Sequence, residues 1–183
     1  MNELDQARRS LLFSLSALTV APMITTSSSR GAAAARGGYV LDAGRGEHLI
    51  HFRDGGDVFI TAGTATGSDN YSMGTQQVKA GGGIPVHRHL HMEEAFYVLE
   101  GSGECILDET HHQIARGASI FIPRNTWHGF ATPNHDLVLL WTMTPAGLDD
   151  FFRETCSPPG SPAKQLTKEQ IRRIALKYGT EFR

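Results

Sequence analysis

The chain has 183 residues, of which 40% are hydrophobic, and this length supports one ordinary hydrophobic core with no room for a second catalytic domain. Its formal net charge of -2 disfavours nucleic acid and anionic membranes as main partners, because both select basic surfaces. A small-molecule substrate or ligand is therefore expected.

Residues 1–36 are predicted to be an export leader. Arg8 and Arg9 precede the stretch SLLFSLSALTVAP, which is too short and too rich in Ser and Thr to span a bilayer as a stable helix. The segment ARRSLLF resembles the twin-arginine pattern, and AAAAR at Ala32–Arg36 offers small residues to a signal peptidase. We expect export to the periplasm or the extracellular space without stable membrane insertion; the alternative is an uncleaved leader on a cytoplasmic protein.

Residues 40–145 read as a series of short strands. Their segments are rich in β-branched, aromatic or alternating residues and are separated by Gly, Asp and Asn: HLIHF, DVFITAGTAT, YSMGTQQVKA, AFYVLEG, GECILD, HHQIA, ASIFIP and LVLLWTM. Because no helical periodicity intervenes, the strands are predicted to pair as antiparallel hairpins that form a sandwich or barrel. This range is therefore assigned to the all-β class.

Residues 146–183 are predicted to be a helical extension. PAGLDDFFRETC favours a short helix with Pro145 near its first turn, and SPPGSPAK is a linker. Thr167 and Gln170 form a capping box for a second helix, which Gly179 ends. Its apolar stripe is expected to pack on the β domain or on a partner subunit of a homodimer, and it consists of Ile171, Ile174, Ala175 and Tyr178.

Histidines at two-residue spacing mark the candidate site, within GGGIPVHRHLHMEEAFYVLEGSG. Side chains alternate faces along a strand, so His87 and His89 point the same way. Glu94 opens the next strand after a short bend, and His128 follows a turn on another apolar strand. Buried imidazoles and a carboxylate are costly unless a divalent cation bonds their lone pairs. The spacing therefore predicts a metal site formed by these four residues.

Other polar and reactive side chains are not assigned to this chemistry. His91 is expected at the rim of the site or behind its ligands, and Glu93 in solvent. Solvent exposure in a hairpin is also expected for His111 and His112, and no role is assigned to the isolated His48, His51 and His135. Cys105 and Cys156 are expected to be separate thiols, because a chain that fills its own core needs no disulfide framework.

Two sequence motifs resemble those of the cupin superfamily, in particular small single-domain, quercetinase-like cupins. The first motif is matched at every position, by Gly81, His87, His89, Glu94 and Gly101. The second is matched by Gly117, Pro123 and His128, whereas Asn125 replaces a glycine and Thr132 an asparagine. Asn tolerates the left-handed backbone that glycine usually supplies in a turn. The resemblance implies a single conical β-barrel of the jelly-roll type over residues 40–145, with metal ligands His87, His89, Glu94 and His128.

The ligand types suit one divalent transition metal. Fe or Mn is favoured if metal is loaded before export, and Ni, Cu or Zn are alternatives. Four ligands leave two adjacent octahedral positions, so we expect a metal-dependent dioxygenase in which Glu94 also serves as base. The alternatives are a metal-dependent isomerase, lyase or hydrolase, and a non-catalytic binding protein.

Two features bear on the expected substrate. About half of the nearby aromatic residues are expected to face the cavity, which suits an aromatic or enolic substrate; these are Phe96, Phe121, Trp127 and Phe130. No Lys or Arg is predicted to face inward from a strand, Arg88 pointing outward, and this disfavours sugar phosphates.

Overall fold

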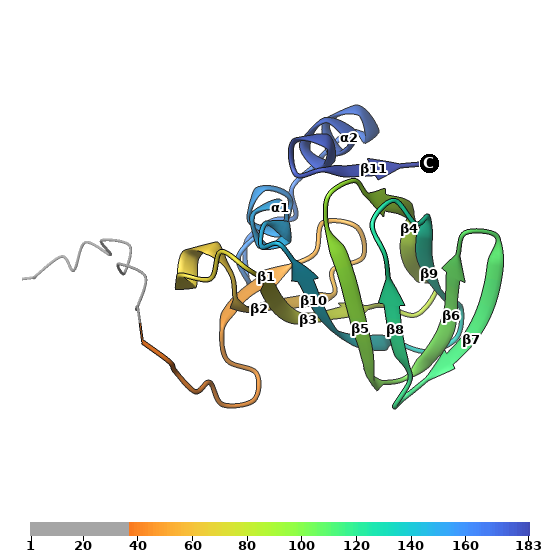
Figure 1. Cartoon of the computed structure of the whole chain (residues 1–183), viewed down its shortest axis with the longest axis horizontal. Coiled ribbons are helices and arrows are strands. Elements are labelled where there is room, and N and C mark those ends of the chain that lie inside the picture. Colours follow the sequence, from red (N-terminus) through yellow and green to blue (C-terminus); the bar gives the residue numbers. More distant parts are fainter. Residues whose placement is uncertain (1–36) are drawn as a thin grey trace, which may run out of the picture. The chain divides into compact units, whose positions relative to one another are not determined.

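The computed structural model describes residues 37–183, which form two antiparallel β-sheets and two α-helices (Figure 1). The predicted export leader lies outside the described residues and stays a prediction, as does the homodimer. Within residues 37–183, no helix combines the length and the apolar character needed to cross a membrane.

The two sheets account for the predicted all-β class. One sheet has the order β1-β2-β3-β10-β5-β8, with strands Glu47–Ile50, Asp57–Ala62, Ser72–Val78, Leu137–Thr144, Glu93–Glu100 and Ser119–Ile122. The other has the order β11-β4-β9-β6-β7, with strands Thr180–Phe182, Gly82–His89, His128–Thr132, Ser102–Leu107 and Thr110–Ala115. A short 3-10 helix, η1, covers Thr64–Thr66. Several neighbours in each sheet are far apart in sequence, such as β3 and β10 or β4 and β9, as in a jelly roll.

The core lies between the sheets because the strands alternate buried and more exposed residues. In β10 every second residue from Leu137 to Met143 is buried, and Trp141 is fully buried. The partner of Trp141 on β3 is Gly74, where a Cβ would lie 2.5 Å from the Trp141 ring. Glycine is therefore needed at this close approach. Both predicted free cysteines, Cys105 and Cys156, are buried and unpaired.

The two predicted helices are α1, Leu148–Thr155, and α2, Lys168–Lys177, and they gather with β11 at one end of the sheets (Figure 1). Pro145 lies three residues before the first residue of α1 and two before its N-cap, Gly147. The predicted capping box is present: Thr167 accepts a hydrogen bond from the Gln170 backbone N–H, and the Gln170 side chain accepts one from Thr167 N–H.

The apolar stripe of α2 packs inward, as expected. Ala175 is fully buried, and the Tyr178 ring lies 6.5 Å from that of Phe151 on α1. Tyr178 also donates a hydrogen bond to Glu154, at 2.7 Å. The stripe thus covers α1 and the end of the β domain.

Helix α1 is tied to η1 through a buried carboxylate. Asp149 accepts hydrogen bonds from the backbone N–H and the hydroxyl of Thr64, at 3.1 and 3.0 Å, and pairs with Arg153 at 2.7 Å. These contacts fix α1 so that its apolar side chains can close the space between the sheets.

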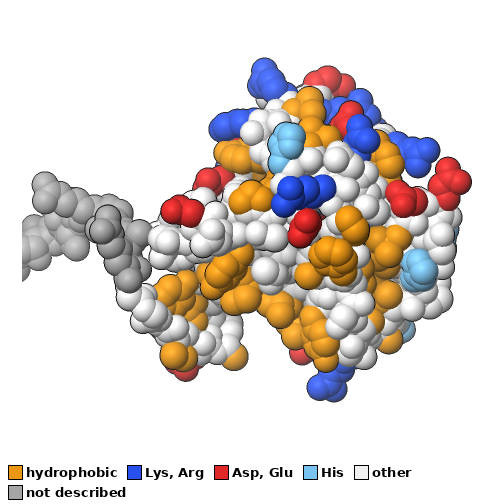
Figure 2. Space-filling view, viewed as in Figure 1, with side chains coloured by type: hydrophobic (Ala, Val, Ile, Leu, Met, Phe, Trp, Pro, Cys, Tyr) orange, Lys and Arg blue, Asp and Glu red, His pale blue; other side chains and the backbone are white. Residues whose placement is uncertain are grey.

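Apolar side chains also lie on the outer surface, over β5 and β8 (Figure 2). Here Tyr97 and Phe121 are 43% and 62% exposed. Phe121 was a candidate for the cavity, and that interpretation is wrong, because its neighbours Ile120 and Ile122 occupy the inward positions of β8.

Candidate metal centre

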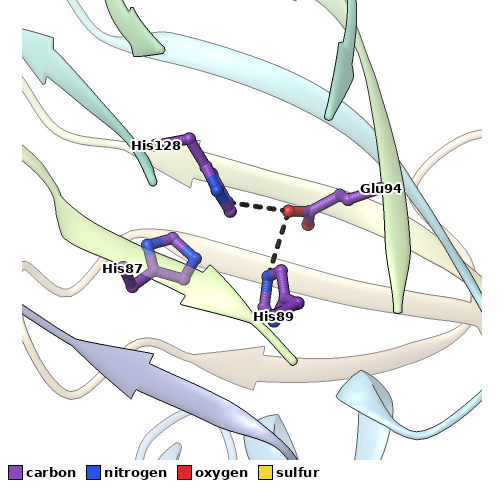
Figure 3. A group of neighbouring side chains, drawn as sticks. All are labelled: His87, His89, Glu94 and His128. Atoms are coloured by element: carbon purple, nitrogen blue, oxygen red, sulfur yellow. Dashed lines mark hydrogen bonds and ion pairs between the residues drawn. The ribbon is translucent and has the colours of Figure 1, made fainter. Parts of the chain in front are cut away.

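The four predicted ligands come from three strands in both sheets (Figure 3). His87 and His89 lie at the end of β4, His128 begins β9 as the cross-strand partner of His87, and Glu94 lies on β5 of the facing sheet. All four are buried, with exposed fractions of 8%, 3%, 0% and 3% respectively. The alternation that buries Glu94 also buries Phe96 and Val98.

Potential ligand atoms from these four side chains converge within 4.8 Å of one another. Glu94 Oε2 lies 3.2 Å from His89 Nε2 and 3.1 Å from His128 Nε2 (Figure 3). The rings of His87 and His128 are 4.1 Å apart between centroids. One small ion could therefore contact all four residues.

The outer nitrogens of the histidines hold the rings in place. His87 Nδ1 lies 2.8 Å from the Pro85 carbonyl oxygen, and His128 Nδ1 lies 2.9 Å from the Thr126 carbonyl oxygen. A carbonyl oxygen only accepts hydrogen bonds, so both Nδ1 atoms carry the proton. In the neutral ring, Nε2 then presents its lone pair to the centre of the site.

This donor set fits a divalent transition metal. A neutral His128 would direct its Nε2 lone pair at Glu94 Oε2, and two acceptors at 3.1 Å repel unless a cation lies between them. Two ligand atoms that each lie about 2.1 Å from a metal, with a right angle between the two metal–ligand bonds, are roughly 3 Å apart. The distances from Glu94 Oε2 to the two Nε2 atoms agree with this separation. The residues that would hold the ion are therefore His87, His89, Glu94 and His128.

Charge and burial favour the protonation states that a metal requires. Burial, together with the neighbouring His128 and His89, holds the pKa of His87 well below its usual value. Burial alone would raise the pKa of Glu94, but without a metal the positive charge of a protonated His89 and hydrogen bonds donated by His128 and His89 through Nε2 outweigh it and lower that pKa; a bound cation would take the place of those protons. At neutral pH the site thus contains a neutral His87 and an ionised Glu94, both competent ligands.

Strand β11 provides a contact to the site that the sequence did not predict. It pairs with the outer side of β4, with Thr180 opposite His89 and Phe182 opposite His87. The Thr180 hydroxyl lies 2.9 Å from His89 Nδ1 and completes the set of Nδ1 partners. A strand of three residues directly after a helix is too short to produce a recognisable alternation.

Replacing Thr180 by valine is expected to weaken metal binding by roughly 10- to 100-fold, because valine keeps the shape but removes the oxygen that orients His89. Competition with a chelator measures this affinity. Thr180→Ser retains the hydroxyl and serves as the control, with an expected affinity near that of the wild type. Equal affinities for Thr180→Val and wild type would show that Thr180 does not position His89.

The remaining candidate side chains lie away from the cluster. His91 is exposed on the bend between β4 and β5. Glu93 is half-buried, and its carboxylate lies 3.6 Å from the Arg124 side chain. His111 and His112 are exposed on β7, as expected, and His111 contacts Glu104.

One residue of each motif, Asn125 of the second and Arg88 of the first, behaves as predicted. Asn125, which replaces a glycine, has a left-handed backbone with φ of 63°, and its N–H donates to the His89 carbonyl. Arg88 points outward, where it pairs with Glu181 and lies 4.6 Å from the centre of the Trp127 ring.

A cavity of about 50 Å³ adjoins the cluster. Of the four aromatic residues expected near the cavity, Phe96 is the one that lines it. The Phe130 ring packs against Phe96, with 4.9 Å between the ring centroids. Other segments supply most of its walls: His51, Phe52, Arg53, Gln76, Ile84, Leu148, Phe151, Phe152, Thr180 and Phe182. A wider groove of about 640 Å³ beside residues 37–45 is lined by none of the four cluster residues.

His51, for which the sequence predicts no role, is a buried residue that lines this cavity. It follows β1 and is 2% exposed. Its Nδ1 accepts a hydrogen bond from the Arg53 backbone N–H at 3.1 Å. Burial, and to a lesser extent the charge of Arg53, holds the pKa of His51 well below 6.5.

The free energy of unfolding of the metal-free protein is expected to decrease as the pH falls below about 6.5. There the unfolded chain protonates His51 while the folded chain keeps it neutral, so acid favours unfolding. His51→Gln should make the decrease shallower, by up to about 1.4 kcal/mol per pH unit. Urea unfolding at about pH 7, 6 and 5 measures this slope. The exposed His135 provides the control as His135→Gln, and equal slopes for both variants would contradict the prediction.

Comparison with known proteins identifies a matching family and several relatives. Residues 74–143 match the family described as the cupin domain. Protein SchB of Streptomyces halstedii is 35% identical over 79 residues, which are 43% of this chain and 57% of SchB. The chain thus spans about half the length of the curated relatives it matches, 57% and 52%.

Solved structures share the fold at low sequence identity. KdgF from Halomonas sp. aligns with a TM-score of 0.54 and 18% identity over 62% of this chain and 98% of KdgF. The polyketide cyclase RemF from Streptomyces resistomycificus aligns with a TM-score of 0.53 and 23% identity over 74% of this chain and 91% of RemF. Residues 74–143 of this chain thus match the cupin domain family, and the aligned structures share the fold of the described residues.

Proposed function

We propose that this cupin is a metal-dependent dioxygenase that acts on a small enolic or enolisable substrate. The observation that carries the proposal is the buried cluster in which three histidines and Glu94 converge. A metal held by these four residues would keep coordination positions open for a substrate. When bound, the metal would act as a Lewis acid and, if it is Fe or Mn, support redox chemistry; Ni, Cu and Zn are alternatives.

The residues around the ion would bind the substrate and move its proton. Glu94 is the one carboxylate of the cluster, and its lowered pKa keeps it ionised, so that it has a free lone pair to accept a proton from an enol or from the carbon beside a carbonyl; its basicity would rise when a substrate displaces the groups that lower its pKa. Phe96 and the α1 side chains Phe151 and Phe152 would exclude water from the reacting atoms. Dry walls also strengthen the charge interactions at the site.

The size of the cavity favours a small enolic substrate over an aromatic one. Cavities that hold a benzene ring measure about 150 Å³, whereas this one measures about 50 Å³. A flavonol would therefore require the walls to move, and a compound of a few carbon atoms would not.

A second candidate function is a metal-dependent isomerase or lyase. The polar cavity walls Gln76 and Arg53 favour it, because they suit a hydrophilic metabolite that changes without oxidation. RemF, which shares the fold, is a polyketide cyclase, and one fold can carry different classes of reaction. In both candidates the first step is proton removal by Glu94.

The deciding experiment begins with elemental analysis of protein purified without added metal. Oxygen uptake is then followed with small 1,3-diketones and, for comparison, flavonols. A dioxygenase should consume O₂ in proportion to diketone. Conversion of substrate at the same rate without O₂ would instead indicate an isomerase or lyase, and binding without conversion would indicate a binding protein.

A further inference from the structure

Arg53, a lining residue of the cavity that adjoins the candidate metal centre, has an incompletely paired guanidinium. Its side chain is 23% exposed, but its Nε and Nη2 atoms are fully buried and have no hydrogen-bond partner among the described residues. Arg53 lies in the loop between β1 and β2 and is a wall of the same cavity as His87, His89 and Glu94.

The neighbouring carboxylate does not satisfy this group. Asp54 Oδ2 lies 3.6 Å from Arg53 Nη2, which is longer than a hydrogen bond. The Asp54 oxygens already accept the backbone N–H groups of Gly56 and Lys79, both at 3.2 Å. Burial lowers the pKa of Arg53, against the attraction of Asp54, but a guanidinium stays protonated near neutral pH.

Leaving buried, charged donors unpaired is costly, so a ligand that accepts their hydrogen bonds would be bound favourably. Arginine presents its N–H groups as a planar fork that matches the two oxygens of a carboxylate. A cavity of about 50 Å³ has space for only a few non-hydrogen atoms. A small carboxylate satisfies both the charge and the volume.

We propose that Arg53 binds the carboxylate of a small organic acid, which is the substrate class of this site, and that this acid's second oxygen function faces the metal cluster. The assignment rests on the proposed function, because it names the substrate of the same cavity. Gln76, buried to 5% exposure on β3, forms a polar wall beside Arg53 that suits a hydroxyl or carbonyl oxygen. The apolar Phe151 and Phe152 leave little room for a longer chain.

The test uses glycolate and its neutral counterpart glycolamide, titrated calorimetrically into the metal-loaded protein. Wild type should bind glycolate at least roughly 10-fold more tightly than glycolamide. Arg53→Gln should lose roughly 10- to 100-fold in glycolate affinity and leave glycolamide affinity unchanged. Arg116→Gln, at an exposed arginine, is the matched control and should behave as wild type. Unchanged glycolate affinity in Arg53→Gln would overturn the proposal.

A second variant and a competing anion complete the test of Arg53. If Arg53→Gln does not fold, Arg53→Lys replaces it: the charge remains but the planar fork is lost, so glycolate affinity should fall several-fold, and no loss would overturn the proposal. Inorganic phosphate is titrated as a competing anion. Tighter binding of phosphate than of glycolate would overturn the assignment to a carboxylate.

Repeating the titration without metal separates this proposal from the proposed function. Glycolate binding that depends on Arg53 in a protein that takes up no metal would support the carboxylate site and contradict the metal-dependent enzyme. Metal-dependent turnover that Arg53→Gln leaves unaffected, with unchanged glycolate affinity, would contradict the carboxylate site alone.

Discussion

Replacing His87 and His128 together by alanine is expected to reduce bound metal from one ion per chain to nearly none, while the two sheets remain folded. The change removes two of the four converging ligands, and each single substitution should already weaken binding strongly. Elemental analysis measures the metal, and circular dichroism checks the fold. The melting temperature should fall toward that of the metal-free wild type, because a ligand that binds only the native state stabilises it.

His91→Ala is the matched control for this experiment. His91 continues the two-residue spacing of His87 and His89 but is exposed on the bend that follows β4. It should therefore retain a full complement of metal. A double variant that still carried stoichiometric metal would show that the ion is held elsewhere.

Replacing Glu94 by glutamine is expected to reduce turnover far more than metal content. With the three imidazoles in place, an amide oxygen can still coordinate weakly, so much of the metal should remain. The amide cannot accept a proton, so turnover per bound metal should fall by roughly 10² or more if Glu94 is the base. Substrate consumption divided by metal content is the quantity to measure.

The neighbouring Glu93 provides the control for that substitution. Glu93→Gln changes a carboxylate that faces Arg124 outside the cluster, so its turnover per metal should equal that of wild type. If Glu94→Gln also kept the wild-type value, Glu94 would be a plain ligand without a role in proton transfer.

Features encoded within a few residues could be predicted from the sequence. Alternation along a strand placed His87 and His89 on one side, and it buried Glu94 with Phe96 on the next strand. The capping box at Thr167 and the left-handed Asn125 also follow from local chemistry. The same alternation, applied to Ile120 and Ile122, places Phe121 on the outer face of the sheet. Phe121 was considered for the cavity only because it is aromatic, without regard to the face on which its position in the strand puts it.

The sequence by itself thus determined the all-β class, the C-terminal helices and the four residues that converge at the candidate metal centre. Only the tertiary structure decided what surrounds them. Thr180 reaches His89 from 91 positions along the chain, and Arg53 and Phe151 meet the cluster from a loop and a helix far from it in sequence. Such contacts depend on how helices and sheets pack. The periodicity of side chains within one helix or strand does not predict that packing. The volume and charge of the cavity, which set the expected substrate, therefore became visible only in the folded chain.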